Sequence, residues 1–217
     1  MVIQHAVCEK CRSYTNQTFE NPALQTSFLV PRLQLELRRR KKSKKKALPP
    51  MAAGNRVMGG GEELFVMERE VAQYPPIFEM VFPEVAGKLA GIDRGGGLNN
   101  FRIAIANIGI RPGATGGTTR HPHDHTAFSK TLAKIAYCFA CAEEKSLNGF
   151  DEIRELICGK RDDVYNFVGC SLQKEQLTNR YLHGLYLRTR GDKQTVLVHL
   201  FASCGMQPYE VVVGKAT

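Results

Sequence analysis

Apolar and polar positions follow the clearest pattern in the C-terminal part of the chain. Between residues 126 and 145 the apolar residues recur at helical spacing, and Asp124 or Thr126 stands where an N-cap is expected. The apolar face consists of Leu132, Ile135, Ala136 and Phe139. This pattern predicts one long amphipathic helix, which Asn148-Gly149 ends.

A shorter helix and four strands are predicted after this long helix. The shorter helix covers residues 150–157 and stops at Gly159. Strand patterns cover residues 165–169, 182–188, 195–201 and 209–213, and Gly191-Asp192 marks a turn between the middle two. Helices packed on one face of an antiparallel sheet are the expected architecture, so the predicted fold class is α+β.

The first half of the chain gives weaker patterns. An apolar series after Cys11 predicts helical structure that Pro22 and Pro31 interrupt or end. Short strands are expected at residues 64–71, 76–82 and 101–107. The glycine triplets at 59–61 and 95–97 lack the lysine and the strand-to-helix context of a phosphate-binding loop, and we interpret both as connectors.

Composition narrows the class of protein. The chain has 217 residues, of which 43% are hydrophobic, and no apolar run approaches the roughly 18 residues of a membrane span. The first seven residues lack the features of a secretion signal. Seven scattered cysteines resemble free thiols more than a disulfide framework. We therefore expect a cytoplasmic protein with no membrane partner.

The net charge of +9 is concentrated in one segment, which we call the basic tract. Without the tract's eight cations, 22 basic residues face 21 acidic ones (30 minus 8 against 21). Such a segment cannot bury apolar surface, and it can bind phosphates without reading sequence. We predict a nucleic-acid partner; a charged loop without a partner is the alternative. The predicted binding residues are Arg38, Arg39, Arg40, Lys41, Lys42, Lys44, Lys45 and Lys46.

Cys8 and Cys11 have the spacing of half a structural zinc site. Zinc prefers four thiolate or imidazole ligands, and His5 is the one other donor before Cys8. Cys138 and Cys141 form a second pair with this spacing. They lie within the predicted long helix, where they either pack in the core or complete the site with the first pair.

Histidines form the other chemically suggestive cluster, at residues 121–125. Three of them alternate with Pro122 and Asp124, and imidazoles can bind transition metals or transfer protons near neutral pH. The tight spacing and the stiff Pro122 favour a surface loop before a helix cap. His183 and His199 lie on predicted strands and are interpreted as packed or surface residues.

Several ordered motifs resemble one group of proteins. Residues 6–15, Phe19-Glu20, Arg32 and the basic tract leading to Leu48-Pro49 are similar to the middle of bacterial HNH-endonuclease-like proteins. In that group a first cysteine pair and a Glu-His-Ile-Ile-Pro-type motif precede a pair like Cys8 and Cys11. The similarity extends to the group's C-terminal extension at residues 127–136, 156–159, 199–202 and 208–214.

The resemblance implies metal-dependent cleavage of DNA. In HNH nucleases a ββα hairpin holds a divalent cation, a histidine activates water, and paired cysteines bind structural zinc. Here the first cysteine pair and the Glu-His segment would precede Met1, so no catalytic residue is assigned. Zinc at Cys8 and Cys11 is expected to be incomplete, and Mg²⁺ or Mn²⁺ is expected only where the nuclease half is present.

The resulting hypothesis divides the chain into three parts. Residues 1–37 are the remnant of a zinc-stabilised ββα motif with its helix, residues 38–50 a basic linker, and residues 51–217 an α+β domain whose antiparallel sheet is packed with helices. Three interpretations stay open. The gene product is a shortened DNA endonuclease, a catalytically silent nucleic-acid-binding protein, or an interaction or small-molecule-binding domain with an incidental basic loop.

Overall fold

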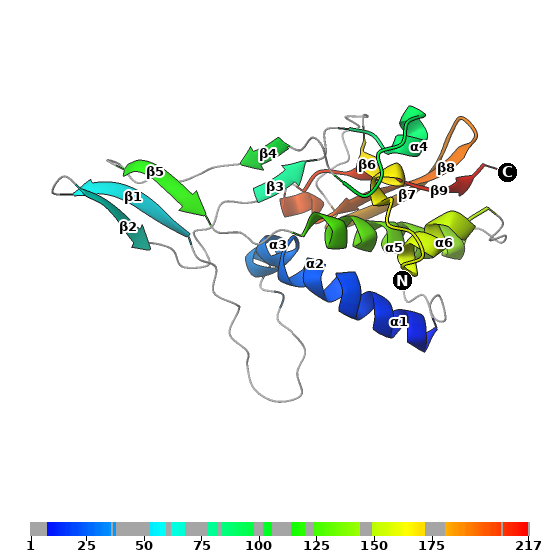
Figure 1. Cartoon of the computed structure of the whole chain (residues 1–217), viewed down its shortest axis with the longest axis horizontal. Helices are drawn as coiled ribbons and strands as arrows, with labels where there is room; N and C mark the ends of the chain where they lie inside the picture. The colour runs from blue at the N-terminus through cyan, green and yellow to red at the C-terminus, as the bar shows by residue number, and fades with distance from the viewer. Residues whose placement is uncertain are drawn as a thin grey trace.

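The fold is described from a computed structural model of the chain (Figure 1). For β1 to β5 only the backbone is described. The described residues are 8–35, 37, 53–59, 62–67, 78–81, 84–97, 102–105, 114–119, 124–143, 149–171, 181–204 and 206–216.

The N-terminal elements form a nearly continuous helical path. They are α1 (Glu9–Thr15), a π-helical turn η1 (Asn16–Glu20), α2 (Asn21–Gln25) and α3 (Leu29–Gln34). The prediction that two prolines interrupt or end helices is wrong: Pro22 lies in the first turn of α2 and Pro31 is the third residue of α3. A proline fits a first turn, because the backbone N–H groups there have no partner within the helix.

The long helix and the shorter helix are confirmed. Helix α5 spans His125–Glu143, and the Ala127 backbone N donates to Asp124 Oδ1 at 2.8 Å, so Asp124 is its cap. Helix α6 spans Asp151–Ile157, and the chain leaves it through Gly159 at a φ of +75°. A side chain there would adopt this φ only with strain. The predicted stop at Asn148 lies outside the described residues.

A four-stranded antiparallel sheet follows, in the order β6-β9-β8-β7. Its strands are β6 (Val168–Cys170), β7 (His183–Arg190), β8 (Lys193–Leu200) and β9 (Tyr209–Lys215). Gly191-Asp192 forms the predicted turn, with Arg190 opposite Lys193. The first predicted strand begins late, because Val164–Asn166 forms a 3-10 turn (η3).

Two smaller antiparallel sheets precede α5 in sequence. One has the order β2-β1-β5 and the other pairs β3 with β4. Their strands are β1 (Ala53–Gly59), β2 (Glu62–Met67), β3 (Phe78–Val81), β4 (Arg102–Ile105) and β5 (Ala114–Thr119). Strands β2, β3 and β4 fall on the predicted segments, with β2 beginning two residues before its predicted start; the remaining ends of these segments lie outside the described residues. No sequence pattern predicted β1, β5 or the short helix α4 (Gly87–Ala90): the two strands lack a clear apolar alternation, and the helix has four residues.

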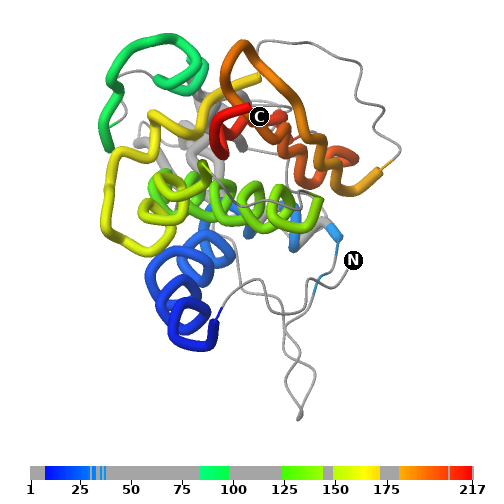
Figure 2. The backbone as a smooth tube through the Cα atoms, turned by 90° about the vertical axis from the view of Figure 1, so that its right-hand side faces the viewer, coloured from blue at the N-terminus to red at the C-terminus, as the bar shows by residue number. Residues whose placement is uncertain are grey.

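Helix α5 is the middle layer of the main body. In Figures 1 and 2 it runs between the N-terminal helices and the four-stranded sheet, and it contacts both, as well as α6. Phe128 is 1% exposed and links the layers: its ring centroid lies 5.2 Å from that of Phe28 and 5.2 Å from that of Tyr209. The α+β class is therefore confirmed: α5 and α6 pack on the four-stranded antiparallel sheet.

No helix within the described ranges is long and apolar enough to cross a membrane.

The histidine on β7 makes stability depend on pH. His183 Nδ1 accepts a hydrogen bond from the Phe201 backbone N at 3.1 Å, and its ring meets the Phe201 ring edge to face at 4.8 Å. Partial burial lowers the pKa of His183, although the residue keeps an exposed side on β7, and burial also lowers the pKa values of His125 and His199. A protonated Nδ1 is itself a donor, so it would face the donating backbone N–H of Phe201 and the hydrogen bond would be lost.

We expect the free energy of unfolding to decrease as the pH falls from 7 to 5. Because the folded pKa of His183 lies below its unfolded value of about 6.5, the unfolded chain binds more protons in this range. The His183→Gln variant, whose amide oxygen can still accept from Phe201, should show a shallower slope in urea unfolding at pH 5, 6 and 7. A slope equal to that of the wild type would contradict this assignment.

Candidate functional site

The predicted zinc-site cysteines occupy the first turn of α1. Cys8 is the N-cap residue, and its Sγ accepts a hydrogen bond from the Cys11 backbone N at 3.3 Å. Cys8 is exposed and Cys11 is partly exposed. Both thiols therefore lie on the same helical turn and are accessible to solvent.

The two thiols also interact with each other. The side-chain hydrogen bond between them lowers the pKa of Cys8 and raises the pKa of Cys11 to about 11. Cys8 is thus the sulfur that ionises first. A thiolate is the form that binds metal or attacks a disulfide, so Cys8 is the more reactive of the two.

A third cysteine, which the sequence analysis did not associate with this pair, lies beside Cys11. Cys158 follows α6, and its backbone N donates to Arg154 O at 2.9 Å. Its side chain hydrogen-bonds with Cys11 and helps to raise the pKa of that thiol. Nearby, the Tyr14 hydroxyl lies so close to Gly159 that a Cβ there would be 1.9 Å from Oη. The end of α6 therefore packs against α1.

Cys138 and Cys141 lie in α5, as predicted, and are partly buried. Burial raises the pKa of both thiols, which keeps them protonated. Cys141 packs against the hydrophobic core and hydrogen-bonds with Tyr137. This environment favours the core interpretation over completion of the zinc site.

Within the described part of the chain, no group of three or more His, Cys, Asp or Glu side chains is arranged to hold a metal ion. Cys8 and Cys11 by themselves fit zinc as two of its four ligands, since they supply thiolates at the usual C-x₂-C spacing. The predicted histidine cluster does not add to them: Asp124 caps α5 and His125 is the first residue of that helix. His121 and His123 lie outside the described residues.

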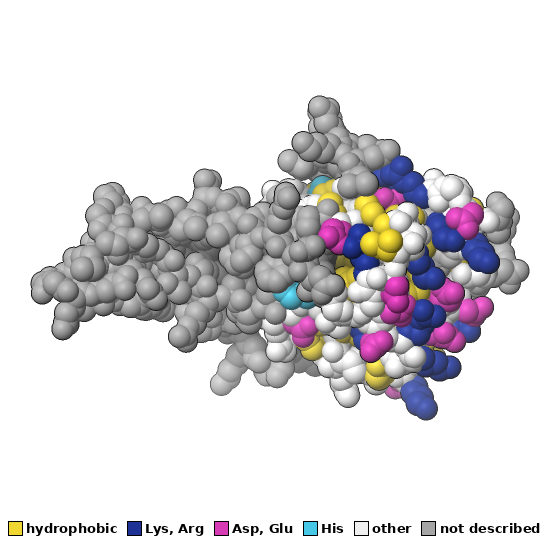
Figure 3. All heavy atoms as spheres, turned by 45° about the horizontal axis from the view of Figure 1, so that its top comes forward, with side chains coloured by type: hydrophobic (Ala, Val, Ile, Leu, Met, Phe, Trp, Pro, Cys, Tyr) yellow, Lys and Arg dark blue, Asp and Glu magenta, His cyan; other side chains and the backbone are white. Residues whose placement is uncertain are grey.

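The basic tract, Arg38 to Lys46, also lies outside the described residues. The described body carries both signs of charge side by side (Figure 3). Its cations are tied to neighbouring carboxylates in many places. These ion pairs are Lys88–Glu152, Arg94–Glu84, Lys134–Glu20, Arg154–Asp151, Arg161–Asp163, Arg190–Glu210 and Lys193–Asp192. Such a surface has no large excess of positive charge.

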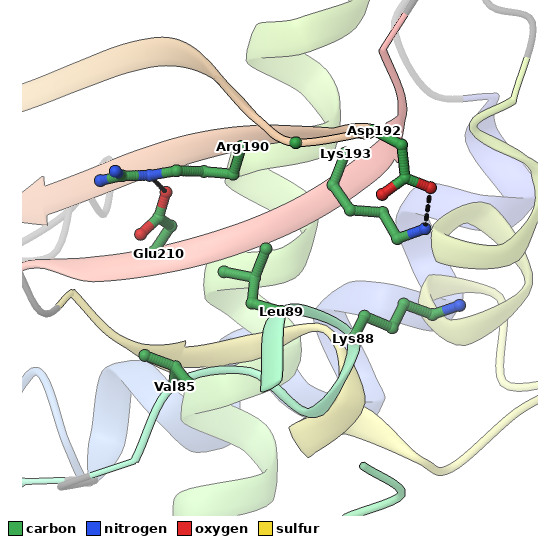
Figure 4. Close-up of a pocket in the computed structure, with 8 residues that line it drawn as sticks. Val85, Lys88, Leu89, Arg190, Asp192, Lys193 and Glu210 are labelled. Carbon is green, nitrogen blue, oxygen red and sulfur yellow. Dashed lines mark hydrogen bonds and ion pairs between the residues drawn. The ribbon is translucent and has the colours of Figure 1, made fainter. Parts of the chain in front are cut away.

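A pocket of about 460 Å³ lies between α4 and the β7–β8 turn (Figure 4). Its lining residues are Val85, Lys88, Leu89, Arg190, Gly191, Asp192, Lys193 and Glu210. The segment that carries Val85 can approach the sheet because Gly169 has no side chain: a Cβ there would be 2.0 Å from the Ala86 backbone N. The Cys170 backbone N donates to Glu84 O at 2.9 Å and holds this segment in place.

Glu210 is the most buried charged residue of the pocket, with 4% of its side chain exposed. Its Oε1 accepts hydrogen bonds from Arg190 Nε at 3.1 Å and from Thr195 Oγ1 at 2.8 Å. The sequence analysis assigned it no role. One sequence feature could have indicated Glu210. It is a charged residue directly before the three valines of β9, and it faces the same side of the strand as Val212.

Comparisons with protein-family models, with curated proteins and with solved structures find no match for this chain.

Proposed function

We propose that the protein binds nucleic acid through the basic tract. The resemblance to HNH-endonuclease-like proteins favours DNA as this partner. One observation carries this proposal: the described body is close to neutral and many of its cations are paired with carboxylates, while eight cations stand together in nine residues. A nucleic-acid backbone is the partner whose charge spacing matches such a tract.

The same proposal assigns a role to α1. It is the helix of the ββα element, and Cys8 and Cys11 are two ligands of a structural zinc ion that fastens this helix. When bound, zinc would hold the turn at Cys8 and stabilise its thiolate. Cys8 ionises first and is exposed, which suits a ligand. The remaining ligands come from groups other than the described side chains, or from a second copy of the chain.

No general base is assigned beside this pair, and the activity we propose for the chain is binding without cleavage. Lys10 and Arg12, the cations of α1, are exposed and can contact phosphates next to the cysteine turn. Nuclease activity, with Mg²⁺ or Mn²⁺, remains the family reaction that the resemblance implies and is included in the test below.

Zinc content tests this assignment. The Cys8→Ser/Cys11→Ser variant should lose zinc to background level, because removal of both thiolates leaves no C-x₂-C chelate. Cys138→Ser/Cys141→Ser is the matched control, since it removes two cysteines at the same spacing from α5, and it should retain wild-type zinc. Metal analysis of the purified proteins measures this, and the zinc-to-protein ratio shows whether two chains share one ion.

Plasmid nicking in Mg²⁺ or Mn²⁺ is measured on the same proteins, and we expect none above a metal-only blank. Nicking that disappears in the Cys8→Ser/Cys11→Ser variant would overturn the assignment of binding without cleavage. Zinc that is unchanged in this variant would overturn the proposed zinc ligands.

A further inference from the structure

The pocket between α4 and the β7–β8 turn has two polar ends and an apolar middle (Figure 4). Arg190 and Glu210 lie at one end, and Lys88 and Lys193 at the other. A ligand of the right length would therefore contact two different kinds of group. This site involves none of the tract residues and none of the cysteines.

The lysine end can accept an anion. Lys193 Nζ donates to Asp192 Oδ2 at 2.7 Å, and Lys88 pairs with Glu152 and lies 4.8 Å from the Phe167 ring centroid. The two carboxylates that these lysines contact are 76% and 55% exposed. Ion pairs this exposed contribute little in water, so a ligand anion can replace them at low cost.

The opposite end offers a donor and an acceptor side by side. Both described hydrogen bonds to the Glu210 carboxylate are made at Oε1, and Arg190 makes its bond through Nε. The Arg190 side chain is 34% exposed. Its terminal nitrogens can therefore donate to a ligand oxygen or nitrogen, while Glu210 Oε2 can accept from a ligand N–H. A planar group with an adjacent donor and acceptor fits this end.

The middle of the pocket suits an apolar, flat group. Val85 and Leu89 form one wall, and the volume of about 460 Å³ lies in the range of sites for small organic molecules. An inorganic anion would occupy the lysine end and leave the rest of the pocket empty.

We propose that this pocket binds a nucleoside monophosphate. The phosphate lies between Lys88 and Lys193, the base packs on Val85 and Leu89, and the hydrogen-bonding edge of the base meets Arg190 and Glu210. Each of the three parts of the pocket then has a matching part of the ligand. The nucleotide is a free one or the end of a nucleic-acid strand, and both carry this chemistry.

Titration calorimetry with AMP, GMP, CMP and UMP tests the proposal, since the chain has no tryptophan to report binding. The full chain is used with the eight tract cations changed to glutamine, so that the tract cannot contribute. At least one monophosphate should bind. The Lys88→Gln/Lys193→Gln variant should weaken this binding about 100-fold, since a hydrogen bond to a charged group changes affinity by roughly tenfold or more.

Three further measurements separate the parts of the pocket. Glu210→Gln keeps the size of the side chain and should weaken binding by about tenfold. Lys160→Gln, an exposed lysine away from the pocket lining, is the matched control and should bind as the parent does. Short oligonucleotides with a terminal phosphate distinguish a strand end from a free nucleotide.

Any of three results would overturn the proposal. The first is that no monophosphate binds at a concentration of about 10 mM, which exceeds the dissociation constants of typical ligand sites. The others are that inorganic phosphate, or the nucleoside without its phosphate, binds as tightly as the nucleotide. Melting temperatures of the variants are measured in parallel. If Glu210→Gln does not fold, the lysine double variant, which changes two side chains that are each 26% exposed and paired with exposed carboxylates, still decides the outcome. Loss of DNA binding through the tract would leave this result unaffected.

Discussion

Changing the eight cations of the basic tract to glutamine is expected to remove most of the affinity of this protein for duplex DNA at low salt. Each phosphate that a Lys or Arg neutralises contributes about −0.9 to the slope of log K against log salt. Eight contacts would give a slope of about −7, and six to ten contacts correspond to a loss of roughly 10³ to 10⁵ in affinity between 50 and 200 mM salt. The wild type should show this dependence.

Two control variants make the measurement specific. The Arg38→Lys/Arg39→Lys/Arg40→Lys variant keeps the charge of the tract. It should bind DNA nearly as the wild type does, because contacts to the DNA phosphates depend on charge. A variant that changes Arg154, Lys160 and Lys215 to glutamine removes exposed cations from the described body, and it should lose far less. Fluorescence anisotropy at several salt concentrations measures all three. Wild-type affinity that does not change between 50 and 200 mM salt would rule out the tract as a phosphate-binding segment.

Phe128→Ala is expected to lower the free energy of unfolding by about 3–5 kcal/mol, the range for truncation of a buried phenylalanine. Phe128 is 1% exposed, and its ring packs between those of Phe28 and Tyr209, at 5.2 Å from each. The alanine variant leaves a cavity between the N-terminal helices and the sheet. Because α5 contacts both layers, neither layer can close the cavity without moving away from the other.

Urea unfolding followed by circular dichroism measures this effect. Ile92→Ala is the control, since Ile92 is 52% exposed and its truncation should change stability by less than about 0.5 kcal/mol. A loss below about 1 kcal/mol for Phe128→Ala would mean that the core does not depend on this ring.

The elements predicted from sequence are those whose signals are local. The apolar face of α5 and the Asp124 cap lie within a few residues of one another, and so do Gly191-Asp192 and the strands on either side. These patterns depend on backbone geometry that a short segment sets by itself. Strands β1 and β5 lack such a pattern because glycines interrupt them. The hydrogen bonds of β5 come from β1, which is distant in sequence, although β1 also pairs with the neighbouring β2.

The prolines illustrate the limit of local rules. A proline ends a helix when it falls in the interior, yet the same residue is compatible with the first turn. Pro22 and Pro31 both lie in first turns. The effect of each proline depends on the residue at which its helix begins. The packing of Phe19 and Phe28 in the core contributes to where these helices begin.

The sequence by itself determined the α+β class, the long helix α5, the turn between β7 and β8, and the concentration of positive charge in one tract. Each of these follows from neighbouring residues or from a sum over composition. Only the tertiary structure placed Cys158 beside Cys11, and only it brought Lys88, Arg190 and Glu210 to one pocket. Cys158 and Cys11 come together as α5 contacts both α6 and the N-terminal helices, while the segment before α4 reaches the sheet because Gly169 leaves room for it. No spacing in the sequence records either meeting.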